Sequence, residues 1–267
     1  MTLAFAIQAY LTSPHFDAFS YSTCTGYTRA LKRLVLLGGE VADVSRAQVM
    51  GILNPLSPGE RAVNLTAIRA FFNWAIDQEM IENNPASKIK FPAQSKHTRQ
   101  WTREEAEALM SCGDAAVEVA CALAYHTGQR MGDVLKMTWG DIEGEGDARA
   151  VRIVQQKTGV ELLVPLAAPL RQRLDLLGRG GPMDRLVDGS PPPHIFRYRF
   201  RQASHKLGIA VHFHGARVSC AGRLAEAGCS TREIMAIGGW KTSAMVDLYT
   251  AQASQMELAR AAIRRLG

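Results

Sequence analysis

The chain has 267 residues, of which 47% are hydrophobic, and a formal net charge of +6 at pH 7. This length suffices for one large domain or two modest ones, and the basic balance favours a polyanionic partner such as nucleic acid, although only weakly. The five cysteines are odd in number and form no C-x-x-C pair, which argues against a disulfide framework or a zinc site. No signal peptide and no membrane-spanning apolar run is found, so we expect a cytoplasmic protein with reduced thiols.

Residues 1–92 carry helical patterns throughout. Apolar residues at helical spacing predict helices over 21–37, 45–53 and 61–80, and the Pro- and Gly-containing segment 54–60 is expected to separate the last two. The aromatic residues of the third helix are interpreted as core: Phe71, Phe72 and Trp74.

A polar, basic stretch without periodicity follows, and we assign residues 93–101 as a linker. Lys96, His97 and Arg99 could lie along a phosphate backbone, or they could belong to a solvated tether. The sequence leaves both interpretations open.

Residues 102–267 are predicted to form a second domain. A capping-box pattern begins at Thr102, a buried helix is expected over 115–126, and two β-rich runs flank a turn that begins at Lys157, which predicts a β-hairpin. The stretch 196–207 predicts a strongly basic helix whose face either contacts DNA, which we favour modestly, or is simply solvated. Together these elements predict a mainly α chain with a small β-hairpin or sheet.

Six polar side chains of this second half stand out: Arg130, Lys157, His214, Arg217, Trp240 and Tyr249. His214 and Arg217 are three positions apart, so on a helix they share one face. No nucleotide-binding glycine loop, H-E-x-x-H motif or carboxylate cluster accompanies them, because Asp133 and Asp141 flank a helix instead of converging. Any chemistry is therefore expected to run without a metal or cofactor.

These residue types suit attack on a phosphodiester. Two guanidiniums can clamp a phosphate and stabilise the charge on a five-coordinate phosphorus. A phenol, with an ordinary pKa of about 10, needs a neighbouring base or the field of arginines to act as a nucleophile. A lysine on a hairpin can protonate the leaving oxygen, and an imidazole can relay the nucleophile's proton.

The order and spacing of these motifs resemble those of the tyrosine recombinase (phage integrase) family. The N-terminal half fits as well, since residues 64–86 look like the last helix of that family's core-binding domain. Four departures from the family pattern remove no reactive group. They are Gln129, Asp133, Gly215-Ala216 and Thr250-Ala251. The segments that carry the match are Thr127–Arg130 with Gly132–Val134, Lys157–Gly159, the H-x-x-R pair at His214 and Arg217, Gly239-Trp240, and Tyr249.

The resemblance implies a helical core-binding domain over 1–92, a linker over 93–101 and an α+β catalytic domain over 102–267. By that resemblance, Tyr249 forms a 3′-phosphotyrosine, Arg130 and Arg217 hold the non-bridging oxygens, and Lys157 is the general acid. His214 assists proton transfer, and Trp240 donates its indole N–H or packs against the phosphate site. The implied partners are double-stranded DNA, three further copies of the chain in a homotetramer on two DNA sites, and an accessory DNA-binding protein; the implied location is the nucleoid when DNA is bound.

Several alternatives stay open at this point. A type IB topoisomerase shares the phosphotyrosine chemistry without strand exchange, and a recombinase-like protein that has lost catalysis would bind DNA only. Lys157 could be a solvated turn residue, Trp240 could be plain core, and His212 is interpreted as having no role. The resemblance does not separate integration, excision, dimer resolution and transposition.

Overall fold

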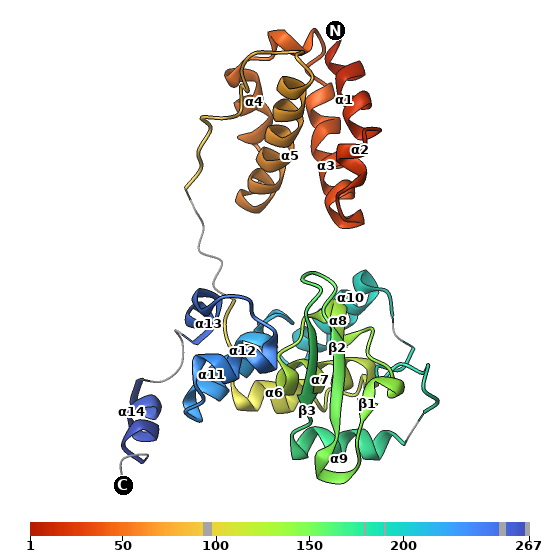
Figure 1. Cartoon of the computed structure of the whole chain (residues 1–267), viewed down its shortest axis with the longest axis vertical. Helices are drawn as coiled ribbons and strands as arrows, with labels where there is room; N and C mark the ends of the chain where they lie inside the picture. Colours follow the sequence, from red (N-terminus) through yellow and green to blue (C-terminus); the bar gives the residue numbers. More distant parts are fainter. Residues whose placement is uncertain (93–97, 179, 190, 251–254, 265–267) are drawn as a thin grey trace. The chain divides into compact units, whose positions relative to one another are not determined.

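The computed structural model describes residues 1–92, 98–178, 180–189, 191–250 and 255–264. The chain separates into two compact units, Met1–Lys96 and His97–Gly267 (Figure 1). The first unit is helical and the second combines helices with one three-stranded sheet, which confirms the predicted fold class. The exact domain and linker boundaries stay a prediction. Among the described residues, no helix is long and apolar enough to cross a membrane.

The first unit is a small helical bundle whose core is built from apolar stripes. Phe71 and Phe72 are fully buried and Trp74 nearly so, as predicted. The segment 54–60 does not wholly separate two helices: Ser57 caps the last helix and Pro58 occupies its first position, where a missing N–H costs nothing. The helices are α1 (Leu3–Leu11), α2 (Pro14–Asp17), α3 (Tyr21–Val35), α4 (Arg46–Leu53) and α5 (Pro58–Asp77), with a 3-10 turn at Val41–Asp43.

The second unit packs helices around a central one and against a small sheet. The helices are α6 (Arg103–Leu109), α7 (Ala115–Thr127), α8 (Met131–Val134), α9 (Ala168–Leu177), α10 (Pro193–Lys206), α11 (Gly215–Glu226), α12 (Thr231–Gly238), α13 (Ser243–Thr250) and α14 (Gln255–Arg264). Helix α7 is buried over most of its length and packs against α6, α9, α10 and α11. This central position explains why its sequence is apolar on nearly every side.

The sheet is antiparallel in the order β1 (Ile142–Glu143), β2 (Ala150–Val154) and β3 (Glu161–Pro165). Strands β2 and β3 form the predicted hairpin, with Val151 opposite Val164 and Ile153 opposite Leu162. Strand β1 was not predicted, because two residues are too few to show an alternation. The inward side chains of β2 pack on the core, so the hairpin turn is carried by a buried strand.

Trp101 anchors the beginning of the second unit. Its ring stacks with Tyr125 and Phe200, and its indole nitrogen donates a hydrogen bond to the carbonyl oxygen of His212 at 2.9 Å. Its backbone N–H donates to the hydroxyl of Ser219 on α11 at 2.6 Å. Trp101 therefore holds the chain just before α11, although the sequence placed it at the end of a linker.

Arg99 does not extend freely toward a ligand. Its guanidinium forms a two-pronged ion pair with Glu105, at 2.7 Å for each nitrogen–oxygen contact. Lys96 and His97, the other two cations considered for a phosphate backbone, lie outside the described residues.

Candidate active site

Tyr249 and His214 meet at the junction of α13 and α11. The phenol oxygen of Tyr249 lies 3.1 Å from Nε2 of His214, which is the residue preceding α11. The phenol ring also lies edge-on to the ring of Trp240, with 5.8 Å between the centroids. The hydroxyl of Tyr249 is thus in hydrogen-bond contact with a group that can exchange a proton with it.

Arg217, on α11, is buried next to this pair, with 1% of its surface exposed. One terminal nitrogen donates to the carbonyl oxygens of Gly128 and Gly238, and the guanidinium lies over the Trp240 ring at 4.3 Å from its centroid. Burial, with the charge of Arg130, lowers the pKa of Arg217 to about 10, so the group stays protonated at neutral pH.

Three buried N–H donors around Arg217 have no acceptor among the described residues. They are the Nε and second terminal nitrogen of Arg217 and the indole nitrogen of Trp240. A buried donor without a partner costs about 1–3 kcal/mol. Such a cluster of unpaired donors, two of them on a cation, is the arrangement that an anion would satisfy.

The close packing of Trp240 depends on the residue at position 238. A Cβ added to Gly238 would lie 1.9 Å from the Trp240 ring, so a side chain there would displace the indole. The Gly-Gly-Trp segment therefore serves to bring the indole against Arg217.

Arg130 enters the site from the segment between α7 and α8. Its guanidinium donates to Oε1 of Gln155 at 3.0 Å and lies 3.9 Å from Oδ2 of Asp133. Asp133 is 5% exposed, and its other oxygen accepts the backbone N–H of Gln156 at 2.9 Å. Asp141 bonds to Thr138 and does not converge on Asp133, whereas Asp133 lies within ion-pair distance of Arg130.

Lys157 lies in the β2–β3 turn and is exposed. The described part of the chain offers it no hydrogen bond or ion pair, so its side chain is the least constrained of the six predicted residues. Its charge nevertheless contributes to lowering the pKa of His214.

The imidazole of His214 therefore faces several cations. Partial burial, followed by the charges of Arg217, Arg130 and Lys157, lowers the pKa of His214 below its ordinary value. A neutral imidazole can accept a proton from the phenol of Tyr249, whereas an imidazolium cannot. Partial burial and the three cations thus keep the ring in the neutral form that can act as a base.

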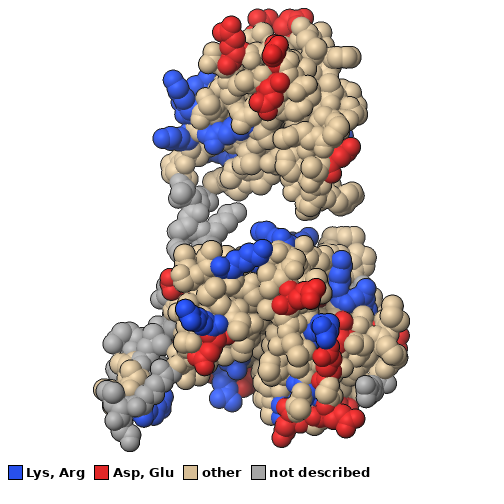
Figure 2. Space-filling model, viewed as in Figure 1, with Lys and Arg blue, Asp and Glu red and all other residues tan. Residues whose placement is uncertain are grey.

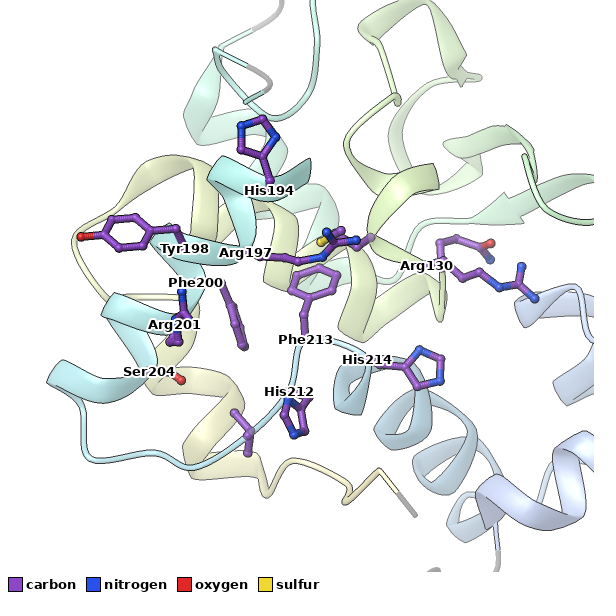
Figure 3. Close-up of a pocket in the computed structure, with 13 residues that line it drawn as sticks. Arg130, His194, Arg197, Tyr198, Phe200, Arg201, Ser204, His212, Phe213 and His214 are labelled. Carbon is purple, nitrogen blue, oxygen red and sulfur yellow. The ribbon is translucent and has the colours of Figure 1, made fainter. Parts of the chain in front are cut away.

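A cavity of about 640 Å³ adjoins Arg130 and His214. Figure 3 shows His194, Arg197 and Arg201 on α10 along one side of it and the segment with His212 and Phe213 along the other. Arg199 belongs to another face of the helix and pairs with Asp114 at 2.8 Å. The basic residues of the predicted helix therefore have two roles: Arg199 forms an internal ion pair, whereas Arg197 and Arg201 line the cavity. His212, interpreted as having no role, lines this cavity.

The surface charge of the second unit is uneven on the face shown in Figure 2. Basic side chains border the end that carries the β2–β3 turn, with an acidic patch among them, and acidic and basic side chains also mix at the opposite end, over α9.

Two residues outside the predicted set, Gln155 and Asp133, also support the site. Gln155 follows the inward-facing Val151 and Ile153 in strand alternation, so its amide had to be buried and therefore hydrogen-bonded. Asp133 lies three positions after Arg130, a spacing at which a carboxylate can reach a guanidinium.

Comparison with known proteins gives matches over most of the chain. The model of the phage integrase family matches residues 99–256. The integrase of Escherichia phage HK022 is 28% identical over 145 residues, which cover 52% of this chain and 39% of that protein. The tyrosine recombinase XerC of Erythrobacter litoralis is 22% identical over 251 residues, covering 86% of this chain and 81% of the relative.

Solved structures share the fold. A λ integrase (75–356) dimer bound to a COC′ core site superposes with a TM-score of 0.79 at 21% identity, covering 96% of this chain and 97% of that one. A λ integrase tetramer bound to a Holliday junction gives a TM-score of 0.77 at 19% identity, covering 91% and 78%.

Proposed function

This chain belongs to the phage integrase family, and on that premise we propose that it is a site-specific DNA recombinase that works through a 3′-phosphotyrosine intermediate. The observation that carries the proposal is the contact of 3.1 Å between the Tyr249 hydroxyl and His214, beside the unpaired donors of Arg217. A nucleophile, a base and an anion site are then within one small volume, which is what phosphoryl transfer requires.

In the proposed reaction, the phenol oxygen of Tyr249 attacks the phosphorus of a DNA phosphodiester. His214 accepts the phenol proton at Nε2, and the bond between phosphorus and the 5′ oxygen breaks. Lys157 supplies a proton to that oxygen, which leaves as a 5′-hydroxyl while the phosphate stays on Tyr249. Rejoining is the reverse attack by a 5′-hydroxyl, and it needs no ATP because one phosphoester bond replaces another.

Arg130 and Arg217 bind the non-bridging oxygens in this scheme, and Trp240 donates its indole N–H or packs against the phosphate. Their donors are oriented before the substrate arrives, so they stabilise the developing charge without reorganisation. Asp133 and Gln155 already hold Arg130, which leaves its remaining nitrogens to the phosphate.

Double-stranded DNA is the proposed partner, and a homotetramer on two DNA sites is the proposed assembly. Support comes from relatives of the same fold, solved as a dimer on a core site and as a tetramer on a Holliday junction. We propose that Arg197 and Arg201, which have no ion pair within the described ranges, contact the backbone phosphates on either side of the cut. The protein would act at the nucleoid, with or without an accessory DNA-binding protein.

The test is covalent trapping on nicked duplexes that cover the genomic DNA flanking the gene, in the presence of EDTA. We expect a protein–DNA band with the wild type and none with Tyr249→Phe. Tyr21→Phe is the matched control, because Tyr21 is an exposed tyrosine (88% exposed) of the first unit. A band that persists in Tyr249→Phe would refute the nucleophile.

Two further outcomes would replace the proposal by its alternatives. Relaxation of supercoiled DNA without preference for a site would indicate a type IB topoisomerase activity. A clear DNA shift with no covalent band on any duplex would indicate a recombinase-like protein that binds DNA without cutting it.

A further inference from the structure

Gln155 lies at the end of β2 with no exposed surface. Its amide oxygen accepts hydrogen bonds from Arg130 at 3.0 Å and from the hydroxyl of Thr158 at 2.7 Å. Its amide nitrogen donates to Oε1 of Gln129 at 2.7 Å and to the carbonyl oxygen of Gly238 at 2.8 Å. Both donors and both lone pairs of the amide are therefore used.

The chemistry of the partners fixes which way the amide points. A guanidinium can only donate, so the atom that faces Arg130 has to be the oxygen; a carbonyl can only accept, so the atom that faces Gly238 has to be the nitrogen. An ionised glutamate offers no donor to Gly238, and a methionine of similar length offers neither group. Glutamine thus fits this position by its paired donor and acceptor.

The amide connects the two arginines of the site. The carbonyl oxygen of Gly238 accepts both Gln155 at 2.8 Å and Arg217 at 2.8 Å, so Arg130 and Arg217 are linked through Gln155 and a single carbonyl. The neighbouring residue has to allow this approach: a Cβ on Gly239, whose φ is +64°, would lie 2.5 Å from the Gln155 amide nitrogen.

The backbone of Gln155 also closes the turn that carries Lys157. Its N–H donates to the carbonyl of Val160 at 2.9 Å, and its carbonyl accepts the N–H of Gly159 at 2.8 Å. With the Thr158 hydroxyl bound to its side chain, Gln155 joins the hairpin turn to Arg130.

We propose that Gln155 is a positioning residue for strand cleavage: it sets Arg130, Arg217 and the Lys157 turn in one frame around the scissile phosphate. This inference rests on the proposed function. A neutral amide orients Arg130 without cancelling its charge, whereas a carboxylate in its place would compete with the phosphate for the guanidinium.

The test compares Gln155→Met with Gln129→Met. Gln129 is also buried, at 1% exposure, and donates to the carbonyls of Thr127 and Ile237. Its side chain accepts one hydrogen bond from Gln155 but makes none to Arg130, so Gln129→Met leaves the contact between Gln155 and Arg130 in place. Both variants lose buried hydrogen bonds, so both should lower the melting temperature by similar amounts. DNA affinity, single-turnover formation of the covalent complex and thermal unfolding are measured for each on the nicked substrate.

We expect Gln155→Met to slow covalent-complex formation by about 10- to 100-fold, by analogy with the loss at metal sites when a group that orients a ligand is removed. DNA affinity should stay near that of the wild type, because the phosphate-binding cations remain. Gln129→Met should slow cleavage clearly less. Equal slowing by the two variants would show a merely structural role and overturn the proposal.

Gln155→Glu provides a second variant of the same shape, used also if Gln155→Met does not fold. When protonated, its carboxyl group again accepts from Arg130 and donates to Gly238; when ionised, it faces that carbonyl with a second acceptor. We expect its cleavage rate relative to the wild type to rise as the pH falls, and a ratio independent of pH would count against the proposal.

The outcomes separate this inference from its premise. A wild-type protein that forms no covalent complex on any duplex refutes the proposed function and the inference with it. A wild-type protein that does form the complex, with Gln155→Met at the same rate, refutes only the positioning role.

Discussion

The two halves of the candidate site are held very differently. Arg130, Gln155 and Arg217 are joined by hydrogen bonds to carbonyls and to one another, and the last two are fully or almost fully buried. Tyr249 is carried by α13, whose buried residue is Val246, and Lys157 by an exposed turn. The groups that would stabilise charge are thus fixed in advance, whereas the nucleophile and the acid lie on elements with less buried area and lower local stability.

The two halves therefore suit two different tasks in catalysis. Charge stabilisation is effective when the donors need not reorganise, so a buried frame serves it. Attack and proton delivery require atoms to approach the phosphate, so lightly packed elements serve them. Substitutions in the two halves should therefore affect cleavage to different extents.

The buried frame should dominate cleavage. We expect Arg217→Ala or Arg130→Ala to slow covalent-complex formation by at least ~10²-fold, as loss of a transition-state donor does. DNA affinity should fall far less, because many other cations contribute. Single-turnover cleavage and DNA titrations measure the two effects.

Arg223→Ala is the matched control for the frame. Arg223 lies on the same helix as Arg217 but stacks over Tyr125, at 4.1 Å from the ring centroid. Loss of binding and cleavage in equal proportion in the site variants, or a comparable defect in Arg223→Ala, would contradict the phosphate clamp.

The exposed acid should matter only for the leaving group. We expect Lys157→Ala to slow cleavage by about 10²-fold, within the range for general acid catalysis. A substrate with sulfur in place of the bridging 5′ oxygen should restore the rate, since a thiolate, with a conjugate pKa of about 8.5, leaves without a proton. Lys136→Ala, which removes an exposed lysine of the same unit, should show no defect on either substrate; failure of the sulfur substrate to rescue Lys157→Ala would assign the lysine another role.

Burial and the three neighbouring cations should together lower the pKa of His214. Because partial burial and the charges of Arg217, Arg130 and Lys157 lower its pKa, we expect the ring in DNA-free protein to titrate below the ordinary value of about 6.5. The neutral base is then present at neutral pH and is lost only in acid. NMR titration of the ring should show an upward shift in Lys157→Ala and none in Lys136→Ala; a ring that titrates above the ordinary value would contradict the proposed field.

The smallest expected effect concerns the free energy of unfolding and a buried histidine of α7. Burial, followed by the charges of Arg223 and Arg173, lowers the pKa of His126 on α7 to about 4. Between about pH 6.5 and 4 the unfolded chain binds a proton here that the folded protein does not, so the free energy of unfolding should fall as the pH falls through this window.

We expect His126→Gln to flatten that part of the pH profile, measured by urea unfolding at several pH values, and to leave the cleavage rate unchanged. An unchanged pH slope would place the acid sensitivity elsewhere. A large loss of cleavage would show that the stability of α7 and the chemistry of the site are not separable.

Local patterns determined much of this protein. The capping signal at Thr102 acts within one helical turn, and the alternation on both sides of Lys157 predicted a hairpin. The order of the polar motifs indicated the family, because the type of each reactive side chain can be read directly from the sequence. What a residue can do as an acid, base or donor is already present in the sequence.

How those groups are supported depends on the packing of the whole second unit. Gln155 joins Arg130 to the carbonyl of Gly238, and Trp101, assigned to a linker, lies in the core and holds the chain before His214. These hydrogen bonds connect residues far apart in the chain, and no local pattern specifies them. Polar groups that lose their water on burial must hydrogen-bond to one another, and such bonds are stronger in the interior than in water. This burial exists only once α7, α11, α12 and the hairpin have packed together.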